Sequence, residues 1–250
     1  MIWFVVGLNG AWMAVALALL LQRYLDRRRL RQFVEDLRHG PPDSRQIVLE
    51  VARRCFLLPF RRNPVFCPRI FDALGATPTA IIRFGGCCSD RSRLLILALA
   101  ELGIRAYQIT LYHRSGQAQH CLVEAQLDGQ PLIVDPSYGI SYTTAAEGPV
   151  GLRDLQRGQT PVYVPLVTDR VCGYPQNAYY DFDFRLSKTA NWTKTRVRRI
   201  VYRVLYRVTG GGVDQMEVPA LLEWPQHLFI ALASTGATML NTAAMLLTLE

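Results

Sequence analysis

Residues 120–135, with the sequence HCLVEAQLDGQPLIVD, carry the clearest local fold signal in the chain. Two apolar-rich runs flank Asp128-Gly129, and Asp-Gly between such runs is typical of the two-residue turn of a β-hairpin. A two-residue loop pairs Leu127 with Gln130 and thereby sets the register of the whole hairpin. The sequence therefore predicts two antiparallel strands, over 120–127 and 130–135.

This register places a histidine and an aspartate on one face of the hairpin. Val123 opposes Val134 on the side expected to face the core, because side chains alternate along a strand. Leu122 opposes Asp135 on the other side, and His120 is the diagonal neighbour of Asp135. Diagonal partners lie about 7–8 Å apart at the backbone, within reach of long side chains. We therefore expect His120 and Asp135 to meet.

Upstream of the hairpin, the segment 84–90 (FGGCCSD) leads from a glycine pair into a leucine-rich run that predicts a largely buried helix. Gly103 is its expected stop, since glycine favours the position just past a helix. Other predicted elements are a helix over 43–58 with Asp43 or Ser44 as N-cap, one or two helical turns over 70–74, and a strand over 107–112.

A cysteine at the start of that buried helix suggests nucleophilic chemistry. The helix N-terminus stabilises a thiolate, and a nearby imidazole forms the thiolate–imidazolium pair that activates cysteine. An aspartate on the other imidazole nitrogen holds its tautomer and orientation. Cys88, His120 and Asp135 supply these three residue types in chain order.

Three motifs in this region resemble the transglutaminase-like core. Residues 86–92 (GCCSDRS), followed by Leu102-Gly103-Ile104, are similar to its G-x-C-x-D-x-[AS] signature and the Leu-Gly-Ile beyond it. Residues 120–124 (HCLVE) resemble its H-x-W-x-E strand, and residues 132–137 (LIVDPS) resemble its apolar-D-P-[ST] element. The resemblance covers roughly residues 65–140 and implies a papain-like α+β fold, with a nucleophile helix packed on an antiparallel sheet.

The resemblance also implies a function and indicates which of the two adjacent cysteines is the nucleophile. The G-x-C-x-D register fits Gly86, Cys88 and Asp90, so Cys88 is the expected nucleophile rather than Cys87. The implied activity is a cysteine protease or amidase that forms a thioester, or a transglutaminase if an amine accepts the acyl group. The backbone N–H of Cys88 is one expected oxyanion donor, and the second is unassigned. Leu122 departs from the family's usual aromatic residue.

The alternative interpretation is a catalytically silent module of the same fold, acting as a binding or assembly subunit of a membrane complex. The complete Cys-His-Asp set argues against it. Six cysteines in 250 residues, without a C-x-x-C pair, indicate neither a disulfide scaffold nor a zinc ribbon. We expect Cys55 and Cys121 to be buried, and no metal or other cofactor. An apolar fraction of 50% excludes a mostly disordered chain.

The N-terminal segment predicts a membrane anchor. Residues 2–21 carry no charge, and about 20 helical residues span the hydrocarbon core of a bilayer. Arginines follow this stretch rather than precede it, which favours an uncleaved anchor over a signal peptide and places the main domain on the cytoplasmic side. We therefore expect a transmembrane helix over 1–22, a basic linker over 23–42, and localisation at an inner or plasma membrane.

The C-terminal part predicts further membrane contacts. Residues 194–208 form an amphipathic helix whose basic side suits an anionic membrane surface better than an ordinary solvated face: Arg196, Arg199, Arg203 and Arg207. Residues 228–249 are uncharged and predict either a second span or a helix packed on the domain or on the first helix.

The predicted organisation is a catalytic core over 43–145, a helical extension over 146–225 and an apolar C-terminal helix over 226–250. Expected partners are a peptide, protein or other amide-bearing substrate, a lipid bilayer and a membrane protein complex. No nucleic acid is expected, because no recognised nucleic-acid motif accompanies the arginines.

Overall fold

The computed structural model describes most of the chain. The described residues are 2–39, 43–60, 76–167, 182–192, 196–216, and 232, 235, 236, 238, 239 and 242. The helices are α1 (Ile2–Val34), η1 (Glu35–His39), α2 (Ser44–Leu57), α3 (Pro78–Phe84), α4 (Cys88–Glu101), α5 (Leu152–Gln156), η3 (Phe184–Leu186), α7 (Arg196–Thr209) and η4 (Gly210–Gln215). The strands are β1 (Ala106–Tyr112), β2 (Ala118–Leu127), β3 (Gln130–Asp135), β4 (Ile140–Thr143) and β5 (Val162–Pro165).

The described strands form one antiparallel sheet in the order β1-β2-β3-β4-β5. The predicted hairpin register is confirmed, with Leu127 opposite Gln130 and Val123 opposite Val134. Asp128 and Gly129 both adopt positive φ, at 48° and 82°, which is the backbone that a two-residue type I′ turn requires. The fifth strand comes from 146–225, the segment expected to be a helical extension.

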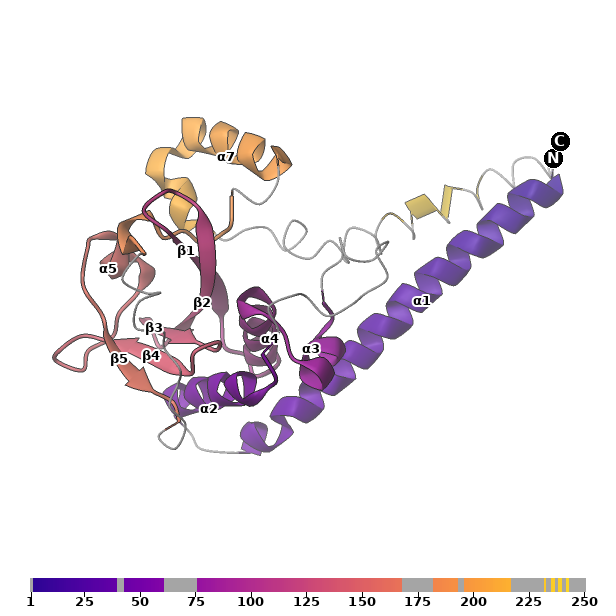
Figure 1. Ribbon diagram of the computed structural model, residues 1–250. Coiled ribbons are helices and arrows are strands. Elements are labelled where there is room, and N and C mark those ends of the chain that lie inside the picture. The colour runs from indigo at the N-terminus through magenta and orange to yellow at the C-terminus, as the bar shows by residue number, and fades with distance from the viewer. Residues whose placement is uncertain are drawn as a thin grey trace.

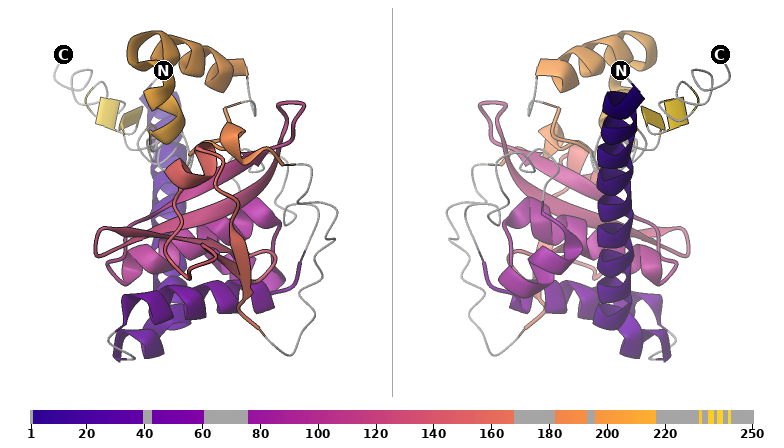
Figure 2. Two further views of the ribbon diagram at one scale, coloured as in Figure 1. Left: turned by 90° about the vertical axis from the view of Figure 1, so that its left-hand side faces the viewer. Right: turned by 90° about the vertical axis from the view of Figure 1, so that its right-hand side faces the viewer.

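The sheet is covered on both faces (Figures 1 and 2). On one face Val123 and Val134 pack with Leu95 of α4 and Val51 of α2 in a cluster that also includes residues of α1. On the other face Leu122 and Ile133 pack with apolar residues from 140–155, in the β4–α5 region. The face that carries His120 and Asp135 is therefore also a core face, and it shields the two side chains from water.

Local signals set the ends of the helices. Asp43 is the N-cap of α2, where its side chain accepts a hydrogen bond from the Arg45 backbone N–H at 2.9 Å. Helix α3 was not anticipated from the sequence, although Thr77 caps it and Pro78 occupies its first turn. Gly103 follows α4 with φ of 77°, as predicted for a residue just past the helix.

The predicted N-terminal transmembrane helix is wrong. Among the described residues, none of the helices combines the length and the apolar character that crossing a bilayer requires. Instead, α1 runs without a break through the arginines to Val34, so the segment expected to be a linker over 23–42 continues this helix and η1 (Figure 1). Leu30 and Val34 are buried in the same cluster as α2 and α4, because the second half of α1 is part of the domain core.

Three of the arginines after the apolar stretch form ion pairs within the protein. The Nε atoms of Arg27 and Arg31 lie 2.8 and 2.9 Å from the two carboxylate oxygens of Glu101, at the end of α4. Arg38 approaches the same carboxylate at 3.6 Å. These charges, which the sequence placed at a membrane surface, therefore hold α1 and η1 against α4.

Two predictions fall on residues outside the described part of the chain. The helical turns expected over 70–74 lie entirely outside it, and so does most of the apolar helix expected over 226–250. Of the isolated residues described near the C-terminal end, Gly236 lies close to α1: a Cβ built on it would lie 3.9 Å from Cδ2 of Trp12.

Candidate active site

The glycine pair before α4 is required by close backbone packing. Gly85 has φ of 77°, and a Cβ on it would lie 1.8 Å from the carbonyl oxygen of Pro59. A Cβ on Gly86 would lie 2.6 Å from Cβ of Asp90. The N–H of Gly86 donates to the Pro59 carbonyl at 3.2 Å, which fixes the chain just before the helix. These contacts set the direction in which α4 begins.

Cys87 and Cys88 have different roles at the start of α4. Cys87 is the N-cap: its backbone N–H and its thiol both donate to the Asp90 carboxylate at 3.2 Å. A hydrogen bond with Cys88, together with burial, raises the pKa of the Cys87 thiol far above its usual range. Cys88 is the first residue of α4, at the positive end of the helix dipole. Cys87 is therefore suited to capping the helix and Cys88 to nucleophilic chemistry.

His120 and Asp135 meet as the hairpin register predicts. Nε2 of His120 lies 2.7 Å from Oδ2 of Asp135, and both residues are buried. The other carboxylate oxygen of Asp135 accepts hydrogen bonds from the backbone N–H groups of Ser137 and Tyr138, at 2.8 and 3.1 Å. Both oxygens are thereby held in place, so the carboxylate orients the imidazole.

The pKa of His120 reflects interactions with both Asp135 and Cys88. Burial alone would lower its pKa, but the charge of Asp135, the hydrogen bond to Asp135 and a hydrogen bond with Cys88 together raise the pKa to about 10. Because Nε2 faces Asp135, Nδ1 is the nitrogen left for the Cys88 thiol. The structure thus brings together all three residues that the sequence selected, with His120 in the middle.

Two aromatic side chains that sequence reasoning missed lie against the imidazole. The ring centroid of Tyr138 is 5.1 Å from that of His120, and the ring of Phe182 is stacked on it at 6.3 Å. Tyr138 lies just after the Asp135 motif, so its position offered a signal. Phe182 offered none, because its segment lies beside β1 through long-range contacts such as the bridge between His113 and Phe182.

Arg91 is a third residue that the sequence pattern does not single out. It is 2% exposed and lies one turn into α4 from Cys88. Its Nη1 donates to the carbonyls of Pro136 and Ser137, at 3.4 and 3.3 Å, and its Nη2 donates to the carbonyl of Leu58. Arg91 therefore connects α4 to the turn that follows Asp135.

The first-turn N–H of Cys88 is available in α4 as the expected oxyanion donor, since the first N–H groups of a helix have no partner within it. The second donor stays unassigned, and residues 61–75, which precede the nucleophile helix in the chain, lie outside the described residues. Within the described residues, no three His, Cys, Asp or Glu side chains are grouped to hold a metal ion.

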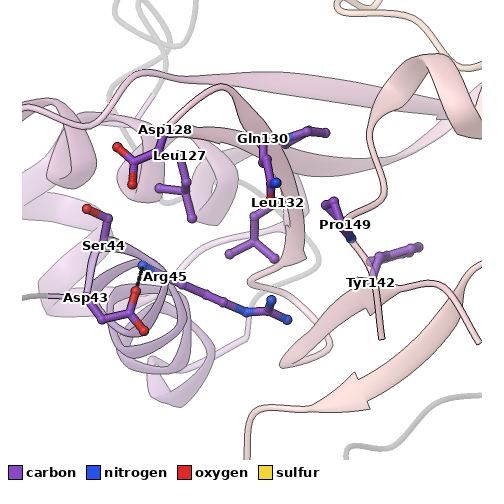
Figure 3. A pocket seen from close by; sticks show the side chains of 10 residues that line it. Asp43, Ser44, Arg45, Leu127, Asp128, Gln130, Leu132, Tyr142 and Pro149 are labelled. Carbon is purple, nitrogen blue, oxygen red and sulfur yellow. Dashed lines mark hydrogen bonds between the residues drawn. The ribbon is translucent and has the colours of Figure 1, made fainter. Parts of the chain in front are cut away.

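A separate pocket of about 300 Å³ lies between the N-terminus of α2 and the β2–β3 hairpin (Figure 3). Arg45 extends from α2 toward the strands that carry Leu132 and Tyr142, and Asp128 of the hairpin turn lies on the opposite rim. None of the three candidate catalytic residues lines this pocket, so it is distinct from the site formed by Cys88, His120 and Asp135.

No model of a known protein family matches the chain, and no curated protein matches it either. The resemblance to transglutaminase-like enzymes therefore rests on the three sequence motifs and their spacing.

Proposed function

We propose that this protein is a cysteine hydrolase or acyltransferase that cleaves or transfers amide bonds through a thioester. Cys88 is the nucleophile, His120 the general acid and base, and Asp135 the residue that orients His120. The observation that carries the proposal is the chain of contacts from Cys88 through His120 to Asp135, with 2.7 Å between Nε2 and Oδ2. A further support is the position of Cys88 at the first residue of a 14-residue helix.

In the acylation step, the Cys88 thiol gives its proton to Nδ1 of His120, and the thiolate attacks the carbonyl carbon of the amide. The negative charge passes to the carbonyl oxygen, which the N–H of Cys88 can stabilise. The C–N bond then breaks, and His120 returns its proton to the leaving amine. The raised pKa of His120 suits this role, because an imidazolium holds the proton that the leaving group needs.

In the deacylation step, His120 removes a proton from the acceptor, which attacks the thioester carbonyl. Water as acceptor releases a carboxylic acid, and an amine releases a new amide; in both cases the C–S bond breaks and the thiol of Cys88 is restored. We place hydrolysis first, because it needs no binding site for a second substrate.

The test measures how fast iodoacetamide alkylates Cys88 at different pH values. Peptide mass mapping separates Cys88 from the other cysteines. We expect wild-type Cys88 to react rapidly at neutral pH, where a free thiol with pKa of about 8.5 is mostly protonated. His120→Ala should remove this reactivity, whereas His113→Ala, which changes an imidazole on the β1–β2 turn, should leave it unchanged. Cys87→Ser removes the neighbouring thiol, so that alkylation at the start of α4 in this variant comes from Cys88.

A generic acyl donor then distinguishes the acceptors. p-Nitrophenyl acetate should give a burst of nitrophenol and an acetyl group on Cys88 that mass spectrometry detects. Loss of the acetyl group at the same rate with and without added amine indicates a hydrolase, and amine-dependent loss indicates a transferase. Alkylation of Cys88 no faster than at an ordinary exposed cysteine would overturn the proposal and favour the silent module.

A further inference from the structure

Within the described part of the chain, helix α7 packs on the domain by one of its sides. Val201, Tyr202 and Leu205 are partly buried and lie against the cluster formed by Trp192, Ala190 and Val213. Lys188 Nζ lies 2.8 Å from Oδ1 of Asp214 in η4, and the Tyr202 hydroxyl donates to the same oxygen at 3.0 Å. The rotation of the helix about its own axis is therefore fixed, and so are the side chains that it turns outward.

The outward surface of α7 carries a row of exposed apolar side chains. Ile200, Val204 and Val208 are 60%, 55% and 79% exposed. Residues four apart lie above one another on a helix, so these three form a continuous stripe. Branched aliphatic side chains in such a row favour removal from water, and in Figure 1 α7 lies along the outer edge of the domain beyond β1.

A row of arginines runs beside this stripe. Each exposed arginine directly precedes an aliphatic residue, so the two rows are parallel and lie about 100° apart around the helix: Arg196, Arg199, Arg203 and Arg207. Helix α7 contains no acidic residue. Within the described part of the chain, none of these four arginines forms an ion pair with a carboxylate.

We propose that α7 is a docking surface for an anionic lipid bilayer, independent of the function proposed for Cys88. An interfacial helix inserts its apolar row between the headgroups and keeps its arginines beside their phosphates. The partly exposed Tyr206 suits the same boundary, where amphipathic rings accumulate. A second copy of α7 fits less well, because apposed copies bring arginine rows together. Nucleic acid fits less well because it leaves the apolar stripe in water.

The test is cosedimentation of the full chain with vesicles of phosphatidylcholine, with or without phosphatidylglycerol, at low and high salt. We expect binding to increase with the anionic lipid and to weaken with salt, since screening shortens the reach of the charges. Arg203→Gln/Arg207→Gln should weaken binding to anionic vesicles by about fivefold per arginine. Ile200→Ser/Val204→Ser should weaken it as well, because the stripe no longer inserts.

The matched control is Arg114→Gln/Arg157→Gln, which removes the same charge from two exposed sites outside α7. It should bind as the wild type does, and thermal unfolding shows that each variant remains folded. Equal binding by the wild type and both α7 variants would overturn the proposal, as would an equal loss in the control. Binding of single-stranded RNA instead of vesicles, or a dimer that only the stripe variant dissociates, would also overturn it. Alkylation of Cys88 should be unaffected in every α7 variant, so this result is separate from the test of catalysis.

Discussion

At the scale of single residues, His120 is held between a charge on one side and a thiol on the other. Its imidazole is 6% exposed, and the carboxylate that pairs with it is completely buried. A buried ion pair stabilises a protein only when its remaining hydrogen-bonding positions are also satisfied. Here the backbone N–H groups of Ser137 and Tyr138 satisfy the second oxygen of Asp135. The triad geometry is therefore built into the folded state.

The raised pKa of His120 predicts how the stability changes with pH. The pKa rises from 6.5 to about 10 on folding, because the charge and hydrogen bond of Asp135 and the interactions with Cys88 together outweigh burial, so the folded state holds the proton more tightly. The stabilisation is complete below pH 6.5 and is lost as the pH rises toward about 10. In that window the free energy of unfolding should fall by up to about 1.4 kcal/mol per pH unit. Urea unfolding at a series of pH values measures this decrease in the free energy of unfolding. His120→Gln should lack the part that comes from His120. The same dependence on pH in the variant and the wild type would contradict the prediction.

A second residue-scale prediction concerns Gly85. Gly85→Ala places a Cβ 1.8 Å from the Pro59 carbonyl oxygen, in a backbone with φ of 77°. Gly116 has a similar φ of 80° with open space around it, so Gly116→Ala has only the backbone strain, about 1 kcal/mol. We expect Gly85→Ala to lower the free energy of unfolding by clearly more than Gly116→Ala does. An equal decrease in the free energy of unfolding for the two variants, measured with urea, would show that the backbone around Pro59 can shift to accommodate the added Cβ.

At the scale of elements, the site depends on how α4 is fixed relative to the β3–β4 turn. Cys88 belongs to the helix, whereas Asp135 ends β3, a strand of the sheet against which α4 packs. Arg91 spans the two, since one guanidinium reaches the carbonyls of Pro136 and Ser137 as well as that of Leu58. We assign Arg91 a positioning role: its guanidinium donates hydrogen bonds to backbone carbonyls and so holds together the elements that carry Cys88 and Asp135.

Arg91→Met should therefore affect stability and reactivity together. It leaves buried carbonyl groups without donors, at a cost of about 3 kcal/mol in the free energy of unfolding. It should also slow alkylation of Cys88 in the fraction that remains folded. Arg91→Lys keeps the charge but loses the planar fork of donors, so an intermediate effect is expected. A normal alkylation rate in a destabilised Arg91→Met protein would reduce Arg91 to a purely structural role.

At the scale of the whole molecule, α1 belongs to the domain through its second half. Figure 2 shows this helix running along the side of the domain that carries α3 and α4. Leu30 is 5% exposed in the core cluster, whereas Leu21 is 58% exposed. The N–H of Thr79 in α3 also donates to Asp26, at 3.2 Å. The same helix is thus a core element in its second half, whereas described side chains of its first half such as Leu17 and Leu21 are exposed.

This division predicts opposite outcomes for the same substitution at two positions of α1. Leu30→Ala removes buried methyl groups and should lower the free energy of unfolding by about 2–5 kcal/mol. Leu21→Ala changes an exposed side chain and should alter it by no more than about 0.5 kcal/mol. Both are measured by urea unfolding of the full chain. Equal small effects would mean that the second half of α1 is not a stabilising part of the domain.

Features that depend on neighbouring residues follow from the amino-acid sequence alone. Asp128-Gly129 sets the turn, the turn sets the register, and the register brings His120 and Asp135 onto one face, because strand geometry is periodic. The glycine pair and the cap of α4 are local in the same way. These local patterns do not predict the contact between Cys88 and His120. That contact was expected from the order of the motifs, which resembles that of the transglutaminase-like core.

The remaining features depend on how distant segments pack in the tertiary fold. The carbonyl groups that accept hydrogen bonds from Arg91 lie 33 to 46 residues away in the chain, and no local sequence pattern predicts such contacts. The stretch before Arg23 is uncharged in sequence, but hydropathy says only that a helix prefers to leave water. What it packs against depends on which surface the fold brings to it. The structure shows that the part of α1 beyond this stretch is packed in the domain core, where Arg27 and Arg31 form ion pairs with Glu101.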